Sequence, residues 1–250
     1  MNLLITAGNT QTPIDRVRCI TNIFSGKTGA AIARTAWGRG HSITLLTSHP
    51  DTLLEYGVNY RDPGERFTVV VYRTFDELAV ILQNQLRSTP FDAVCHSAAV
   101  SDFLPAGTFS PKPGTAFNAR TGQWEGRSEP PTLTEQMASK ISSAEPELWV
   151  RLVRAPKLID RFRNPWGFAG ILVKFKLEVG VGEKELIEIA EASRERSAAE
   201  LMVANTLEGA PHWAFIGPVK GRYDRVPRKE LPDRLVLTIE DLYQERAGHG

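Results

Sequence analysis

The sequence predicts an α/β fold: a Rossmann-like, doubly wound and mostly parallel sheet with helices on both faces and a flap insertion. Patterns typical of strands and of helices alternate along most of the chain. Several strand patterns are continuous apolar runs, such as NLLITAG at 2–8, which is typical of strands buried on both faces. A segment at 105–139, rich in Pro, Gly, Thr and Ser, interrupts the alternation.

The expected strands are apolar runs that end at turn residues. They cover 2–8, 42–48, 66–73, 91–103 with its loop, 147–156, 168–179 and 200–209 with its loop. The expected helices have apolar residues at helical spacing and cover 29–41, 75–88, 156–163 and 182–198. No internal repeat or clean linker divides the chain, so we expect a single domain over 1–250.

The segment at about 105–140 is long for a loop between two elements. Segments of that length usually carry a function or are disordered. We therefore expect a flexible flap, and a spacer without a role is the alternative that composition leaves open.

The composition limits which classes of protein this sequence can belong to. The 250 residues carry 42% hydrophobic and 24% charged side chains, with a formal net charge of +1. That balance is ordinary for a globular protein and provides no bulk charge for nucleic acid or a membrane surface. No apolar run approaches the roughly 20 residues needed to span a bilayer. Cys19 and Cys95 form no disulfide framework, and the N-terminus lacks a signal-peptide pattern, so a reducing cytoplasm is expected.

The stretch TNIFSGKTGAAIA at 21–33 contains the end of a P-loop pattern. Thr21 stands where that pattern needs its first glycine, and the nearest expected strand lies well upstream. The stretch therefore does not predict a P-loop. Small residues before a helix can still bind an anion, because the first N–H groups of a helix lack partners. A helix capped by Ser25 without any ligand fits the spacing equally well.

Five segments together resemble the phosphopantothenate–cysteine ligase family, in its free-standing form. They are ITAGNTQTPIDRVRCITNIFSGKTG, HSAAVSDFLP, SKISS, KFKLEVG and MVANTLEG, and they follow the family's order from near the N-terminus to about Gly209. The first segment is the most specific of the five. The resemblance implies a ligase of coenzyme A biosynthesis that acts as a homodimer on small molecules.

The implied reaction joins 4′-phosphopantothenate to cysteine. The carboxylate of phosphopantothenate attacks the α-phosphate of a nucleoside triphosphate and pyrophosphate leaves. The amine of cysteine then attacks the acyl-nucleotide, and an amide forms as the nucleoside monophosphate departs. Mg²⁺ is the implied cofactor because it neutralises the triphosphate. Bacterial members mostly use CTP and eukaryotic members ATP, and the sequence leaves the choice open.

The resemblance implies two catalytic residues. Asn22 matches the family asparagine that holds the acyl-nucleotide, and an amide can donate to a developing oxyanion without adding charge. Lys140 in SKISS matches a flap lysine that contacts the triphosphate. Without the resemblance, the interpretation would be that Asn22 caps a loop and that Lys140 is an exposed surface charge. The residues implied for phosphopantothenate are Arg18, Asn22, Ser25, Gly26 and Lys27.

A second group is implied at the nucleotide: Gly8, Ala98, Ala99, Val100, Asp102, Lys140, Phe175, Lys176 and Asn205. Gly8 and the turn at 98–100 also lie at the carboxyl ends of expected strands, where ligands bind in such sheets. Asp102 could equally close an Asx-turn, and Phe175 could be a core side chain. Phe103 stands where the family usually has Tyr, so a phenolic hydrogen bond is lost there. Thr206 stands where the decarboxylase-fused members tend to have Asp, which leaves the base preference open. No metal ligand is assigned.

Two other functions are alternatives to the ligase. A short-chain NAD(P)-dependent reductase should show a glycine fingerprint after the first strand and a Tyr-x-x-x-Lys pair, and TAGNTQTPID lacks those glycines. A non-catalytic nucleotide-binding relative remains open, because a fold does not prove a function. The presence of Asn22 and Lys140 favours an enzyme.

Overall fold

The computed structural model describes residues 1–127, 130–136, 141–142 and 144–248. The chain divides into two compact units. The sheet unit comprises Met1–Thr10, Ile23–Val100 and Lys157–Gly250, and the hairpin unit comprises Gln11–Asn22 and Ser101–Pro156. A single domain over 1–250 stays a prediction. Within the described ranges, no helix is both long and apolar enough to cross a membrane.

The sheet unit is built on an eight-stranded sheet in the order β15-β14-β13-β12-β6-β1-β4-β5. Its strands are β1 (Asn2–Ala7), β4 (Ser42–Thr47), β5 (Phe67–Val71), β6 (Ala93–His96), β12 (Ile171–Glu178), β13 (Leu201–Thr206), β14 (Trp213–Val219) and β15 (Arg222–Pro227). The six strands from β5 to β13 pair in parallel, and β14 and β15 add antiparallel pairs at one edge. Read by chain position, those six give the order of dinucleotide-binding folds, so the predicted fold class is confirmed.

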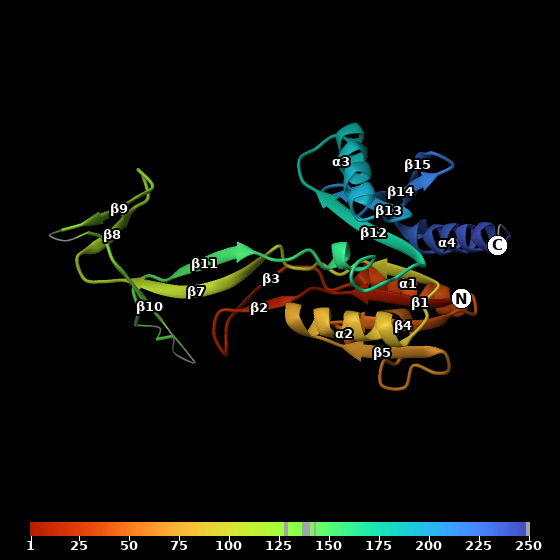
Figure 1. Cartoon of the computed structure of the whole chain (residues 1–250), viewed down its shortest axis with the longest axis horizontal. Coiled ribbons are helices and arrows are strands. Elements are labelled where there is room, and N and C mark those ends of the chain that lie inside the picture. Colours follow the sequence, from red (N-terminus) through yellow and green to blue (C-terminus); the bar gives the residue numbers. More distant parts are fainter. Residues whose placement is uncertain (128–129, 137–140, 143, 249–250) are drawn as a thin grey trace. The chain divides into compact units, whose positions relative to one another are not determined.

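Helices cover both faces of this sheet, because alternate strand residues point to opposite faces. The helices are α1 (Lys27–Gly38), α2 (Phe75–Ser88), α3 (Glu183–Arg196) and α4 (Leu231–Gly248). Leu3, Ile5 and Ala7 of β1 share one core with apolar residues of α1 and α4. On the other face, Leu186 and Ala190 of α3 pack with Met202 and Ala204 of β13. Figure 1 shows α3 lying along β12 and β13.

Helix α2 begins at a capping box. Thr74 Oγ1 accepts from Glu77 N at 3.2 Å, and Glu77 Oε2 accepts from Thr74 N at 3.1 Å. The helix carries the chain from β5 back across β4 and β1 to β6, in the direction opposite to the β1–α1–β4 crossover. Since both crossovers are right-handed, α2 covers the face opposite to α1.

In the described part of the sheet unit there are also three short 3₁₀ helices: η1 (Pro50–Tyr56), η2 (Leu158–Arg161) and η3 (Arg228–Glu230). The sequence indicated the second, within 156–163, and not the other two. It also left the closing segment unassigned, which forms η3 and α4.

The start of α1 differs from the alternative of a helix capped by Ser25. Gly26 is the N-cap residue, in the left-handed region at φ 84°, and no side chain caps the helix. The backbone carbonyl of Ser25 instead accepts a hydrogen bond from Thr52 Oγ1 at 3.2 Å. Because glycine has no side chain, the residue at this position does not cover the first turn of the helix.

The hairpin unit is made of short antiparallel strands. They are β2 (Gln11–Pro13), β3 (Cys19–Thr21), β7 (Phe103–Pro111), β8 (Thr115–Asn118), β9 (Gln123–Gly126), β10 (Leu133–Glu135) and β11 (Trp149–Arg154). Phe117, Trp124 and Trp149 form an aromatic cluster with ring centroids 4.6 to 5.2 Å apart. Paired strands thus lie within the segment that the sequence predicted to be a flap, and the flexibility of that segment stays a prediction.

A proline explains why the sequence pattern did not predict strand β7. A proline within a run argues against a central strand because it cannot donate to the ladder. β7 nevertheless lies between β10 and β11. Pro105 pairs with Leu152 beside a register shift between Val150 and Leu152, where the ladder is already interrupted.

Candidate active site at the strand ends

The strand order reverses between β1 and β6, and ligands of open α/β sheets bind at such a point, beyond the carboxyl ends of the strands. The chain leaves β1 at Gly8 and leaves β6 into the turn at 97–100. Ala99 N donates to Gly8 O at 2.8 Å, and Thr10 N donates to Ala99 O at 3.3 Å. The structure thus brings together Gly8 and the turn that contains Ala98 and Val100.

Gly26 and Gly29 lie against the same strand end. A Cβ atom on Gly26 would lie 2.3 Å from Gly8 N, and one on Gly29 would lie 2.6 Å from Ala7 Cβ and 2.7 Å from Ser97 Oγ. Because Gly26 has no Cβ atom, its loop can lie close to β1. Because Gly29 has none either, α1 can pack closely on the sheet. Backbone N–H groups at the start of such a helix can approach a phosphate directly.

The arrangement of these glycines resembles a dinucleotide-binding glycine fingerprint. Gly8 follows the first strand, and Gly26 and Gly29 keep the last spacing of G-x-G-x-x-G. The sequence reading missed this because residues 11–22, part of the hairpin unit, separate Gly8 from Gly26. A search for a glycine pattern interrupted after its first member would have found it.

Lys27, the first residue of α1, forms an exposed ion pair with Glu55 at 2.8 Å. The hydrogen bond that Lys27 Nζ donates to Glu55 raises the pKa of Lys27, so the ammonium stays charged. Tyr56 Oη donates to Lys27 O at 3.1 Å. A second cation, which sequence reasoning missed, lies at the same turn: Arg228 of η3 donates to Thr28 Oγ1. Burial lowers the pKa of Arg228, and no local pattern signals a residue so distant in sequence.

The predicted residues of β12 and β13 lie farther along the same edge of the sheet. Phe175 packs against the core beneath α1 and α4. Lys176 points to the opposite face and forms an ion pair with Glu178 at 2.7 Å. Asn205 is half-buried in β13, in register with Leu177. Thr206 Oγ1 accepts from Gly209 N at 3.0 Å, a bond that an aspartate at this position could also accept.

Three predicted residues belong to the hairpin unit. Arg18 forms an ion pair with Asp15 at 2.7 Å and donates to Ile141 O at 2.7 Å. Asn22 is half-buried just after β3. Asp102 is exposed and directly precedes β7, where its carbonyl accepts from Ala155 N at 2.8 Å. The assignment of each residue to a ligand stays a prediction.

The Asp15 carboxylate organises the loop that carries Arg18. It accepts from Val17 N and Arg18 N, each at 2.9 Å, and from Ile141 N at 3.2 Å. These backbone bonds, that from Val17 first, together with the Arg18 guanidinium hold the pKa of Asp15 well below its usual range. The Asp15 carboxylate therefore bonds both to the backbone of this turn and to the guanidinium of Arg18.

The remaining predictions concern a lysine and a metal. Lys140 lies outside the described residues. Among the residues that are described, no group of three or more His, Cys, Asp or Glu side chains has the arrangement of a metal site. Mg²⁺ often needs only one or two carboxylates besides substrate phosphates.

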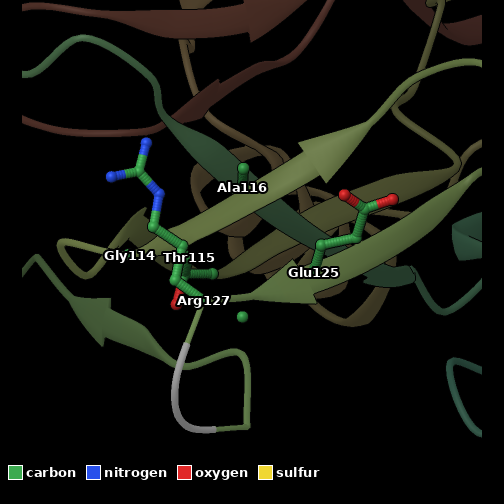
Figure 2. A pocket seen from close by; sticks show the side chains of 6 residues that line it. Gly114, Thr115, Ala116, Glu125 and Arg127 are labelled. Carbon is green, nitrogen blue, oxygen red and sulfur yellow. The ribbon is translucent and has the colours of Figure 1, made fainter.

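One hollow lies on the β8–β9 hairpin, with a cavity volume of about 330 Å³. It is lined by Gly114, Thr115, Ala116, Glu125, Gly126 and Arg127, with Glu125 and Arg127 at its two ends (Figure 2). None of the predicted site residues contributes to it.

Comparison with known proteins points to one family. Residues 1–115 match the family described as the DNA/pantothenate metabolism flavoprotein C-terminal domain. The chain is 31% identical over 247 residues to the coenzyme A biosynthesis bifunctional protein CoaBC of Thermococcus kodakarensis, covering 96% of this chain and 51% of that protein. The CoaBC of Mycobacterium tuberculosis H37Rv is 30% identical over 205 residues, covering 82% of this chain and 41% of that protein. The chain thus spans about half the length of the curated relatives it matches.

Solved structures share the fold. The DNA/pantothenate metabolism flavoprotein of Streptococcus pneumoniae superposes with a TM-score of 0.74 at 24% identity, covering 97% of this chain and 99% of that one. A Cab2 mutant in complex with phosphopantothenate-cysteine gives a TM-score of 0.71 at 19% identity, covering 99% and 88%. The matched family and the similar sequences, on a shared fold, confirm the resemblance to the phosphopantothenate–cysteine ligase family that the five sequence segments indicated.

Proposed function

We propose that the protein is a phosphopantothenate–cysteine ligase of coenzyme A biosynthesis. It would join 4′-phosphopantothenate and L-cysteine through an acyl-nucleotide made from CTP or ATP. A carboxylate does not condense with an amine unaided, and the mixed anhydride supplies both a reactive carbonyl and a leaving group. The name of the CoaBC relatives, which assigns them to coenzyme A biosynthesis, and the complex of a Cab2 mutant with phosphopantothenate-cysteine support this choice.

One observation carries the proposal. At the strand-order reversal, Gly8 and Gly26 approach so closely that neither a side chain nor a gap separates the two loops, and the turn at 97–100 is bonded to the same strand end. This arrangement brings two loops and one helix terminus to a single edge of the sheet, where the first N–H groups of α1 can approach a phosphate, and it supports binding of a nucleoside triphosphate.

Within this proposal each predicted residue has a task. Gly8, the turn at 98–100, Phe175, Lys176 and Asn205 bind the nucleotide from the sheet unit. Arg18, Ser25, Gly26 and Lys27 bind phosphopantothenate. Asn22 donates its amide hydrogen to the carbonyl oxygen of the acyl-nucleotide as charge develops there. Lys140 follows the charge that moves onto the departing pyrophosphate.

Mg²⁺ is the proposed cofactor, and it would lower the charge repulsion of the triphosphate. Asp102 fits its preference for oxygen ligands, since it is an exposed carboxylate two residues beyond Val100. A homodimer in the cytoplasm completes the proposal, on the basis of the family resemblance.

The test is pyrophosphate release by purified protein with Mg²⁺, 4′-phosphopantothenate and cysteine, with CTP and ATP compared. We expect release that requires phosphopantothenate and favours one triphosphate. No release with either triphosphate would overturn the proposal, and a protein that then still bound a triphosphate would be a non-catalytic relative.

A further inference from the structure

His96 lies directly beneath the turn at 97–100, as the last residue of β6, and the sequence reading gave it no role. The side chain is buried, with only 8% of the residue exposed. Its ring packs on Phe162 with centroids 5.1 Å apart. A buried polar ring in an apolar setting needs a hydrogen-bond partner.

That partner is Thr6, on the neighbouring strand β1. His96 Nδ1 lies 3.0 Å from Thr6 Oγ1, and Thr6 is fully buried. The same hydroxyl oxygen accepts from Ala98 N at 3.1 Å. Among the described residues these are the two hydrogen-bond neighbours of the hydroxyl group, so its hydrogen points at Nδ1 and the imidazole carries its own hydrogen on Nε2.

The direction of these bonds requires a neutral His96. Burial, together with the positive charge of Lys174 in register on β12, lowers the pKa of His96 to about 4. The ring therefore keeps its acceptor nitrogen throughout the neutral pH range. A protonated ring would present an N–H at Nδ1 in place of this acceptor, and the Thr6 hydroxyl could then no longer donate to the ring.

We propose that His96 is a positioning residue for nucleotide binding: by fixing the hydroxyl of Thr6, it holds the backbone amide of Ala98 in the turn that receives the nucleotide. Other bonds fix the rest of this turn, since Ser97 Oγ donates to Thr6 O at 2.6 Å and Ala99 N donates to Gly8 O at 2.8 Å. The hydrogen-bond chain from His96 through Thr6 sets the position of the Ala98 amide. The inference rests on the proposed function in assigning the turn to a nucleotide.

Two variants at each position separate the hydrogen-bond chain from simple packing. His96→Leu fills the site without an acceptor, whereas His96→Asn keeps an oxygen close to the place of Nδ1. Thr6→Val keeps the shape without the hydroxyl, whereas Thr6→Ser keeps the hydroxyl. Val94→Ala is the matched control, because Val94 is fully buried two residues earlier on the same face of β6 and its side chain cannot hydrogen-bond.

The experiment is calorimetric titration of each folded variant with MgCTP and MgATP, with the melting temperature of each recorded. For the triphosphate that the wild type binds, we expect His96→Leu and Thr6→Val each to raise Kd about fivefold, the loss of one hydrogen bond. Asn and Ser should restore the wild-type Kd. The double variant should lose no more than either single one, because both break the same chain.

An unchanged Kd in His96→Leu, additive losses in the double variant, or an equal loss in Val94→Ala would overturn the inference. So would a wild-type protein that binds neither triphosphate, since the turn would then receive no nucleotide. Binding is measured without turnover, so a protein that binds the triphosphate but releases no pyrophosphate would refute the ligase and leave the role of His96 to be judged on Kd alone.

Discussion

The Cβ atom that Gly26 lacks would lie 2.3 Å from the backbone nitrogen of Gly8. Gly26 also has φ 84°, a conformation that other residues rarely adopt. We therefore expect Gly26→Ala to lower the free energy of unfolding by about 3 kcal/mol, from strain and overlap combined. Urea unfolding followed by tryptophan fluorescence measures this.

Gly57 separates these two causes, because it has φ 72° with nothing within 4 Å of the site of a Cβ atom. Gly57→Ala should lose only about 1 kcal/mol from backbone strain. Equal losses in the two variants would mean that the close approach of Gly26 to Gly8 does not matter for stability.

Asn22 is the proposed oxyanion donor, which predicts a selective loss of turnover. Asn22→Ala should lower kcat by about 100-fold and leave the KM for the triphosphate unchanged, since removal of a single oxyanion donor has that effect in other enzymes. Steady-state pyrophosphate release gives both constants. Asn84→Ala, on the exposed surface of α2, is the control and should retain wild-type kinetics. A rise in KM without a fall in kcat would reassign Asn22 to binding alone.

The Asp15 carboxylate links stability to acid pH. Its folded pKa lies below the value of an unfolded chain, so the stability it contributes is complete above that unfolded value, about 4, and is lost as pH falls toward the folded pKa. Asp15→Asn lacks this contribution at every pH. We expect the difference in urea midpoint between wild type and Asp15→Asn to be constant above pH about 5 and to shrink below pH about 4. A difference that does not depend on pH would show that the charge of Asp15 is irrelevant.

Lys174 also has a lowered folded pKa, and it should affect stability in the alkaline range rather than in acid. Burial lowers its pKa to about 8, although its Nζ donates to Ser193 O at 2.8 Å. Between pH 8 and the unfolded value of about 10.4, the unfolded chain binds the proton and the folded chain does not, so stability rises with pH. The stability of wild type relative to Lys174→Met should increase across this window in urea unfolding at several pH values. A relative stability that falls there would contradict the lowered pKa.

The sequence predicts the sheet unit well where local pattern and tertiary position agree. The runs that became β1, β4, β6, β12 and β13 contain buried apolar residues, and α2 and α3 have apolar positions at helical spacing. The run of β5 is apolar as well, although this strand lies at the edge of the sheet and only its Phe67 is buried. The exposed strand β3 and the proline-containing strand β7 carry no such signal, because their pairing partners lie elsewhere in the chain.

The site shows the same division between local and distant information. Gly8 and the turn at 97–100 were predicted from their places after apolar strands. The contact of Gly26 with Gly8 was hidden by the inserted residues 11–22, and Arg228 reaches Thr28 from 200 residues away. His96 gave no pattern because its partner Thr6 belongs to another strand.

The most direct test of the central claim follows one oxygen atom. Phosphopantothenate labelled with ¹⁸O in its carboxylate is turned over with cysteine and the preferred triphosphate, and the products are analysed by mass spectrometry. Attack of the carboxylate on the α-phosphate predicts one ¹⁸O atom in the nucleoside monophosphate and none in pyrophosphate. Label in inorganic phosphate with release of a nucleoside diphosphate, or an unlabelled nucleoside monophosphate, would contradict the acyl-nucleotide route.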